Sequence, residues 1–172
     1  MDNISTEILF ATLGILIIFS AYFSGSETGI MSLNRYRLRH LEKQNHSGAK
    51  RVSRLLARPD KLIGLILIGN NLVNIFATLI TGIIAERLYG DTGIFYAGLL
   101  LTLIILIFAE VTPKTLAALY PEKIAFPSSI ILSLLLKLLF PFVVAVNWIT
   151  NGLLMLIGIS PEQRQEHSLS SE

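Results

Sequence analysis

Charged residues are distributed along this 172-residue chain so that long uncharged runs alternate with short charged segments. The first three runs cover residues 8–26, 62–85 and 92–109, which is 19, 24 and 18 residues. A helix that crosses a bilayer needs roughly 20 mostly apolar residues. The pattern therefore predicts an all-α membrane protein with three transmembrane helices, at about residues 5–31, 60–88 and 93–120.

The segment between the first two predicted helices is strongly basic. Residues 34–61 hold nine of the fourteen Lys and Arg residues and only two acids. Because cytoplasmic loops of membrane proteins are enriched in Lys and Arg, we expect this segment inside the cell and the N-terminus outside. Apolar residues recur at roughly helical spacing over 34–58, with a break at residues 46–48. This pattern predicts a pair of short amphipathic helices near the inner surface, and a solvated basic loop is the alternative.

The last apolar stretch, residues 124–159, is divided by Pro127, Lys137 and Pro141. Its first part is too short to span comfortably. Two short in-plane or re-entrant helices would leave the C-terminus inside, whereas one crossing at residues 141–159 would leave it outside. We prefer the first arrangement, because Lys137 falls where a hairpin turn would meet water or headgroups. The transmembrane domain then covers residues 1–160, and the polar residues 161–172 are expected to form a linker.

Composition narrows the class of protein further. Hydrophobic residues make up 52% of the chain and charged residues 15%, whereas a soluble domain carries about 25% charged residues. The chain has no cysteine, and its three histidines are scattered. The sequence contains no nucleophile–base pair and no phosphate-binding glycine loop. We therefore expect no enzymatic activity.

The second predicted span carries an unusual group of amides. Asn70 and Asn74 are four residues apart, so they share a helix face. Polar groups inside a bilayer are costly and usually functional, and amide oxygens are neutral, hard ligands. Hydrogen bonding between helices is the alternative role. A third asparagine, Asn71, lies within the same five residues, and this density favours a functional role.

The third span ends in a carboxylate beside a proline. Glu110 follows the apolar run, and Pro113 has no N–H to donate, so we expect a free carbonyl at Ala109. An ion pair between Glu110 and Lys114, four residues further on, is the alternative.

The first span ends in small and polar residues. Gly25 and Gly29 have a spacing that allows close helix packing, with packing alone as the alternative to a ligand role. Ser24 and Ser32 add hydroxyls. A rise of about 1.5 Å per residue puts Ser24, Asn70 and Glu110 all in the inner half of the bilayer. Such an all-oxygen set suits Mg²⁺, Ca²⁺ or Na⁺ rather than zinc or copper, and one carboxylate is few for Ca²⁺.

Three motifs in order, at residues 23–28, 69–74 and 110–114, resemble the transmembrane domain of the CNNM/CorC magnesium transporter family. The resemblance covers about residues 5–160. It implies a homodimer in the cell membrane that transports Mg²⁺, with Na⁺-coupled export. The arrangement preferred above for residues 124–159 puts the C-terminus in the cytoplasm. The resemblance also implies a metal site at Ser24, Asn70, Asn74 and Glu110. Gly25, Ser32 and Ala109 are possible additional ligands, and Gly25, Gly29 and Pro113 are expected to pack helices.

Members of that family continue into a pair of CBS domains that bind nucleotide. The linker at 161–172 is therefore expected to lead to an absent regulatory domain. We expect neither an ATP site nor a nucleic-acid partner in this chain. The alternative function is a membrane scaffold that anchors such a domain, with the polar residues serving only to dimerise it.

Overall fold

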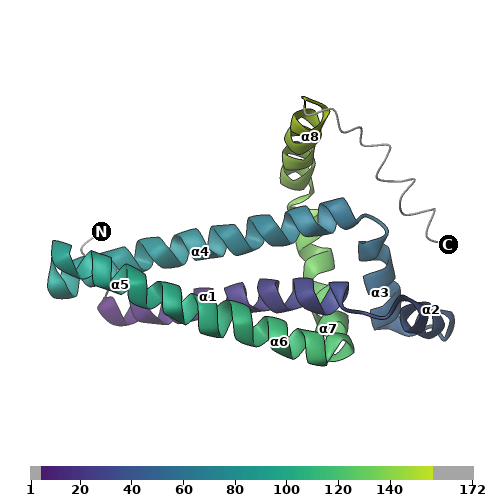
Figure 1. Cartoon of the computed structure of the whole chain (residues 1–172), viewed down its shortest axis with the longest axis horizontal. Helices are drawn as coiled ribbons and strands as arrows, with labels where there is room; N and C mark the ends of the chain where they lie inside the picture. Colours follow the sequence, from purple (N-terminus) through teal and green to yellow (C-terminus); the bar gives the residue numbers. More distant parts are fainter. Residues whose placement is uncertain (1–4, 157–172) are drawn as a thin grey trace.

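Three long helical segments, each antiparallel to the one before it in the chain, lie side by side in the computed structural model, which describes residues 5–156 (Figure 1). They are α1 (Thr6–Met31), α4 (Pro59–Tyr89) and a third segment made of α5 (Asp91–Ile104), η1 (Ile105–Val111) and α6 (Thr112–Leu119). Each is long and apolar enough to cross a membrane. The predicted fold class is thus confirmed. Residues 157–159 of the predicted in-plane stretch and the predicted linker at 161–172 lie outside the described residues.

Local chemistry determines where these helices begin and end. The Ser5 hydroxyl accepts a hydrogen bond from the Ile8 amide at the start of α1, and Pro59 occupies the first turn of α4. Both are favourable helix starts, because a first-turn amide has no partner inside the helix. Gly90 ends α4 with a φ of 69°, a conformation that glycine adopts without steric cost. The chain therefore reverses there and enters α5 directly.

The third long segment contains a π-helical stretch that the sequence did not predict. The amide of Thr112 donates to the carbonyl of Ile107, five residues earlier rather than four. The stretch ends two residues before Pro113, and α6 continues in the same direction (Figure 1). Single-turn π-helical stretches occur often at functional sites.

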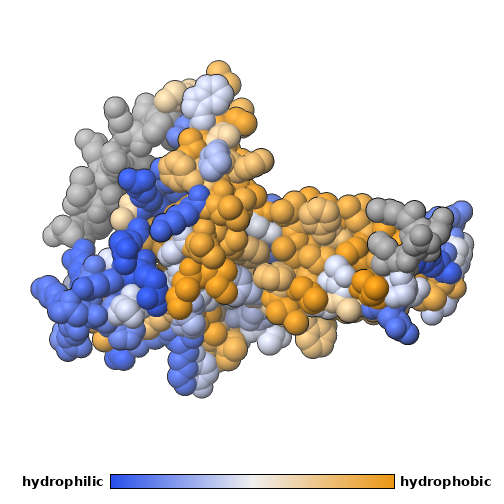
Figure 2. All heavy atoms as spheres, turned by 180° about the vertical axis from the view of Figure 1, so that it is seen from behind, coloured by the Kyte–Doolittle hydropathy of each residue, from blue (hydrophilic) through white to orange (hydrophobic). Residues whose placement is uncertain are grey.

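Two short helices form one end of the molecule, which we call the basic end. These are α2 (Arg35–Lys43) and α3 (Ser47–Leu56), where the sequence left a solvated loop as the alternative. The side chain of Asn34 caps α2, and Nδ1 of His46 accepts the Ala49 amide at 3.2 Å to cap α3. Val52 and Leu55 are buried beneath them. Hydrophilic side chains gather here, and a largely hydrophobic band covers the long helices between this end and the opposite one (Figure 2).

The last two helices run across the long helices rather than along them (Figure 1). They are α7 (Pro121–Leu138) and α8 (Phe140–Leu156), and the angle between them is 77°. A pair bent this far is compatible with one broken span as well as with a re-entrant hairpin. The bend is at Leu139, two residues after Lys137, because Pro141 lacks the N–H that would continue α7. Lys137 is instead an exposed residue in the last turn of α7.

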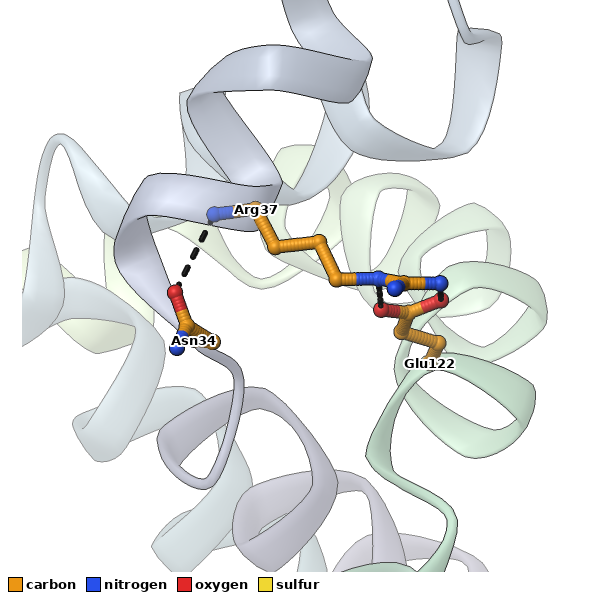
Figure 3. A network of polar contacts seen from close by, with 3 residues as sticks. All are labelled: Asn34, Arg37 and Glu122. Carbon is orange, nitrogen blue, oxygen red and sulfur yellow. Dashed lines mark hydrogen bonds and ion pairs between the residues drawn. The ribbon is translucent and has the colours of Figure 1, made fainter.

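Helix α7 is held by close contacts with α1 and with the basic end. A Cβ on Gly29 of α1 would lie 3.2 Å from Cγ2 of Ile124, and one on Gly48 of α3 would lie 2.8 Å from Cβ of Phe126. Arg37 of α2 forms an ion pair with Glu122 in the first turn of α7 (Figure 3). These contacts leave little freedom for α7 to reorient without moving α2 and α3.

The buried core lies where α1, α4 and α7 meet α3. Its largest completely buried side chains include Ile30, Leu62, Leu65 and Leu132. Most other apolar side chains on the long helices are exposed, as expected where lipid rather than protein covers them.

Candidate cation site

A cluster of three side chains joins α1 to α4, and we call it the serine–asparagine cluster. Oγ of Ser20 lies 3.0 Å from Oδ1 of Asn70 and 2.8 Å from Oδ1 of Asn74. The two asparagines, one turn apart, therefore do share a face. Ser20 is 1% exposed, and both asparagines are partly buried.

The proton count of this cluster is informative. A serine hydroxyl has one proton, so it can donate to only one of the two amide oxygens at a time. The Ser20 oxygen and the other amide oxygen then face each other without a proton between them. This contact becomes favourable when that amide turns to donate its NH₂ group, or when a cation binds among the oxygens. The cluster is thus an oxygen-rich position at the centre of a helix pair.

The sequence pointed to Ser24, and the structure places a different serine against the asparagines. Ser20 lies one turn earlier on α1, on the same face as Ser24. This four-residue spacing was the signal that could have identified it. Ser24 itself is 1% exposed, and within the described residues its Oγ has no hydrogen-bond partner. A buried hydroxyl without a partner costs about 1–3 kcal/mol, which a ligand at this position would offset.

Two close contacts place all three long helices at the level of Ser24. A Cβ on Gly69 of α4 would lie 2.6 Å from Cε1 of Phe23, and one on Gly25 would lie 3.4 Å from Cβ of Pro113 on α6. Gly25 and Pro113, both expected to pack helices, therefore face each other within one chain. Gly29 packs on α7 instead.

Glu110 lies in η1, one turn before Pro113. Its side chain is partly buried, and within the described residues its carboxylate forms no ion pair or hydrogen bond. The alternative ion pair with Lys114 is not formed. Ala109 is completely buried. The last π-helical hydrogen bond runs from Thr112 to Ile107, and a free carbonyl at Ala109 stays a prediction.

Other polar residues lie away from the cluster. Ser32 is exposed at the end of α1, about 12 Å from Ser24 at 1.5 Å per residue. Asn71 is exposed on another face of α4. Thr81 is buried further along α4, and its Oγ1 has no partner in the described part of the chain.

The donor chemistry of the site is almost entirely neutral oxygen. Over residues 5–156 no group of three or more His, Cys, Asp or Glu side chains comes together. Hydroxyl and amide oxygens with one nearby carboxylate are ligands for a hard cation rather than for zinc or copper.

The Phe23–Gly69 contact yields a stability prediction. Gly69→Ala should lower the stability of the fold by about 1–3 kcal/mol, because the added methyl overlaps a buried ring. Gly82→Ala on the same helix is the matched control, since a Cβ there meets nothing within 4 Å. Thermal unfolding of both variants in detergent measures the difference. Equal melting temperatures would show that the packing of α1 on α4 does not depend on the close contact between Phe23 and Gly69.

The fold and the cluster together define a multi-pass membrane domain with hydrogen-bonded polar side chains between its long helices. Residues 11–172 match the family described as the Cyclin M transmembrane N-terminal domain. The chain therefore belongs to the CNNM family, as its three motifs predicted.

Relatives of known sequence agree with this assignment. The whole chain is 54% identical to the UPF0053 inner membrane protein YfjD of Escherichia coli (strain K12) and 49% identical to a UPF0053 protein of Haemophilus influenzae. It covers 40% and 41% of these two proteins. A chloroplastic DUF21 domain-containing protein of Arabidopsis thaliana is 31% identical over 86% of the chain and 22% of its own length. The chain thus spans about two fifths of its bacterial relatives.

Proposed function

We propose that this domain transports Mg²⁺ across the membrane, exporting it in exchange for Na⁺. The observation that carries the proposal is the serine–asparagine cluster, in which two amide oxygens of α4 lie within 3.0 Å of the Ser20 hydroxyl of α1. Ser24 adds a buried hydroxyl without a partner, and Glu110 adds a carboxylate without a partner in the described residues. The proposed ligands are Ser20, Ser24, Asn70, Asn74 and Glu110.

The ligand set favours Mg²⁺ over the other hard cations. Mg²⁺ keeps several of its waters and is often held by only one or two carboxylates, whereas Ca²⁺ takes six to eight oxygen ligands. Na⁺ accepts the same neutral oxygens at half the charge, so it can compete for the site. A cation that binds one arrangement of the three helices more tightly than another shifts the population between them. Exchange of Mg²⁺ for Na⁺ at shared ligands therefore provides a route to coupled transport.

Flux through liposomes tests the proposal. Mg²⁺ should leave vesicles that contain the chain when Na⁺ is present outside, and much less when a bulky organic cation replaces Na⁺ at equal ionic strength. Raising Na⁺ should also weaken the apparent Mg²⁺ affinity more than the organic cation does. If no Mg²⁺ moves and no cation changes the thermal stability of the chain, the scaffold alternative is favoured.

We infer that the basic end faces the cytoplasm, which puts the N-terminus outside. Helix α4 separates the basic end from the α4–α5 turn, and the two lie at opposite ends of the molecule (Figure 1). Single cysteines can be introduced at the exposed residues Ser47 and Asp91, because the chain has no native cysteine. An impermeant thiol reagent should label Asp91→Cys from outside intact cells and Ser47→Cys only after the membrane is opened. Labelling of both from outside would contradict three spans.

We also propose that two copies pair through α4 and α5. Asn71 presents an exposed amide on an otherwise largely apolar surface of α4. On the same face, Thr78 borders a hollow of about 390 Å³ between α4 and α5. Polar side chains in lipid are costly unless another helix covers them. Asn71→Cys should therefore form a disulfide-linked dimer in membranes, whereas Ile18→Cys on the exposed face of α1 should not. The reverse result would place the interface on α1.

A further inference from the structure

A groove beside the candidate site lies between α1, α6 and α7, and its volume is about 320 Å³. Its walls are almost entirely apolar. The Tyr22 hydroxyl donates a hydrogen bond of 2.8 Å to the Ser128 carbonyl, so this polar group already has a partner. The lining residues of the groove include Tyr22, Pro113, Leu116, Lys123, Pro127 and Ile131.

One cation interrupts this apolar lining. Lys123 lies in the first turn of α7, is exposed, and holds its Nζ 4.8 Å from the centre of the Tyr120 ring. Pro127 has no N–H to donate to the Lys123 carbonyl four residues earlier, so the same turn also carries a backbone acceptor. The groove therefore combines a long apolar wall with one positive charge and one acceptor.

The position of Lys123 relative to the membrane is given by its neighbours. Glu122, the preceding residue, forms the ion pair with Arg37 of the basic end (Figure 3). Lys123 is thus next to the basic end, and we place it at the level of the lipid headgroups. From there the groove runs along α6 and α7 past Leu116 and Ile131, which are 48% and 46% exposed.

We propose that this groove binds an anionic phospholipid. The phosphate contacts Lys123, the polar headgroup donates to the free carbonyl of the same turn, and one acyl chain lies against Leu116 and Ile131. Charge complementarity selects this occupant: an apolar groove with one cation at headgroup level matches a lipid that has an apolar chain and one negative charge. Basic side chains near a membrane surface are known to attract anionic lipids. A lipid seated here packs against Pro113, which contacts Gly25 beside Ser24.

Lipid-dependent thermal stability of the purified chain in detergent tests this proposal. Phosphatidylglycerol should raise the melting temperature by about 5 °C at saturation, and phosphatidylcholine should raise it clearly less. Lys123→Gln should raise about tenfold the phosphatidylglycerol concentration that gives half of the full melting-temperature shift, because it removes the charged contact. Lys137→Gln is the matched control, since it removes an exposed lysine of the same helix outside the groove. Native mass spectrometry counts the lipids retained by each protein, and it should show less phosphatidylglycerol on Lys123→Gln than on the wild type and Lys137→Gln.

Groove filling supplies the second variant. Ile131→Trp should reduce phosphatidylglycerol binding without removing any charge, and a melting temperature close to that of the wild type in lipid-free detergent would show that it folds. An unchanged response of Lys123→Gln, or equal shifts with the two lipids, would overturn the proposal. A full shift with inorganic phosphate would indicate a simple anion site instead. If Ile131→Trp changes only the fraction of dimer, the groove is occupied by a second copy and not by lipid.

Discussion

Replacing Glu110 by glutamine is expected to abolish Mg²⁺ binding and leave the fold intact. Glu110 is the one acidic side chain among the proposed ligands, so it supplies the net charge that attracts a divalent ion. Two unit charges 4 Å apart attract each other by about 4 kcal/mol at an effective dielectric constant of 20. Since 1.4 kcal/mol corresponds to a tenfold change in affinity, the loss should be at least about a hundredfold.

The fold should tolerate this change because the carboxylate has no partner to lose. Within the described residues Glu110 forms no ion pair or hydrogen bond, and its side chain is only partly buried. Thermal unfolding without Mg²⁺ should therefore give nearly the same melting temperature for Glu110→Gln and the wild type. Isothermal titration measures the affinity, with Glu86→Gln, an exposed carboxylate near the far end of α4, as the control. Unchanged Mg²⁺ affinity in Glu110→Gln would remove this residue from the site.

The three spanning helices could be predicted because the thickness of the bilayer sets the length of a spanning helix, and the uncharged runs of the sequence have that length. Helices α7 and α8 could not be placed in the same way. The run from residue 138 to 161 is long enough to span, and composition does not tell which way a helix points. What determines their direction is the bend before Pro141 and the packing of α7 on Gly29 and Gly48, contacts that leave no periodic signature.

Which serine of α1 contacts the asparagines depends on how far α1 is shifted along α4, and this shift could not be predicted from the sequence. The ring of Phe23 packs on Gly69, and α1 and α4 are antiparallel. Three residues back from Phe23 on α1 is Ser20, and three residues forward from Gly69 on α4 is the position midway between Asn70 and Asn74. A side chain–glycine contact thus places Ser20 against the two amides. The spacing of the asparagines was sufficient to predict their shared face.

The π-helical turn at Glu110 shows a second limit of the sequence. Pro113 indicated a missing backbone hydrogen bond, and the sequence alone suggested that one carbonyl was simply left free. The helix also widens before the proline, where the Thr112 amide donates to the Ile107 carbonyl, and η1 carries Glu110 within the widened turn. Helix α1 packs against both η1 and α6, and local propensity does not encode such tertiary contacts.

The serine–asparagine cluster carries the second large expected effect. Asn70→Leu and Asn74→Leu should each abolish Mg²⁺ binding, because each removes an oxygen from the position that the Ser20 hydroxyl marks. Asn71→Leu should cost much less, since Asn71 is exposed and lies about 100° around the helix from Asn70. Isothermal titration of the three variants measures the order. If Asn71→Leu is the most damaging, the wrong face of α4 has been assigned to the site.

Two further variants separate cation binding from hydrogen bonding between helices. Asn74→Asp keeps an oxygen at the cluster and adds negative charge, so Mg²⁺ affinity should be retained or increased. It also places a negative charge at a partly buried position, so a cluster that only joins helices would lose stability. Ser20→Ala should weaken Mg²⁺ binding, and its effect should be smaller than additive in combination with Asn74→Leu, because the two side chains act as one unit. Loss of thermal stability in Asn74→Asp that Mg²⁺ does not restore would instead assign the cluster to helix packing.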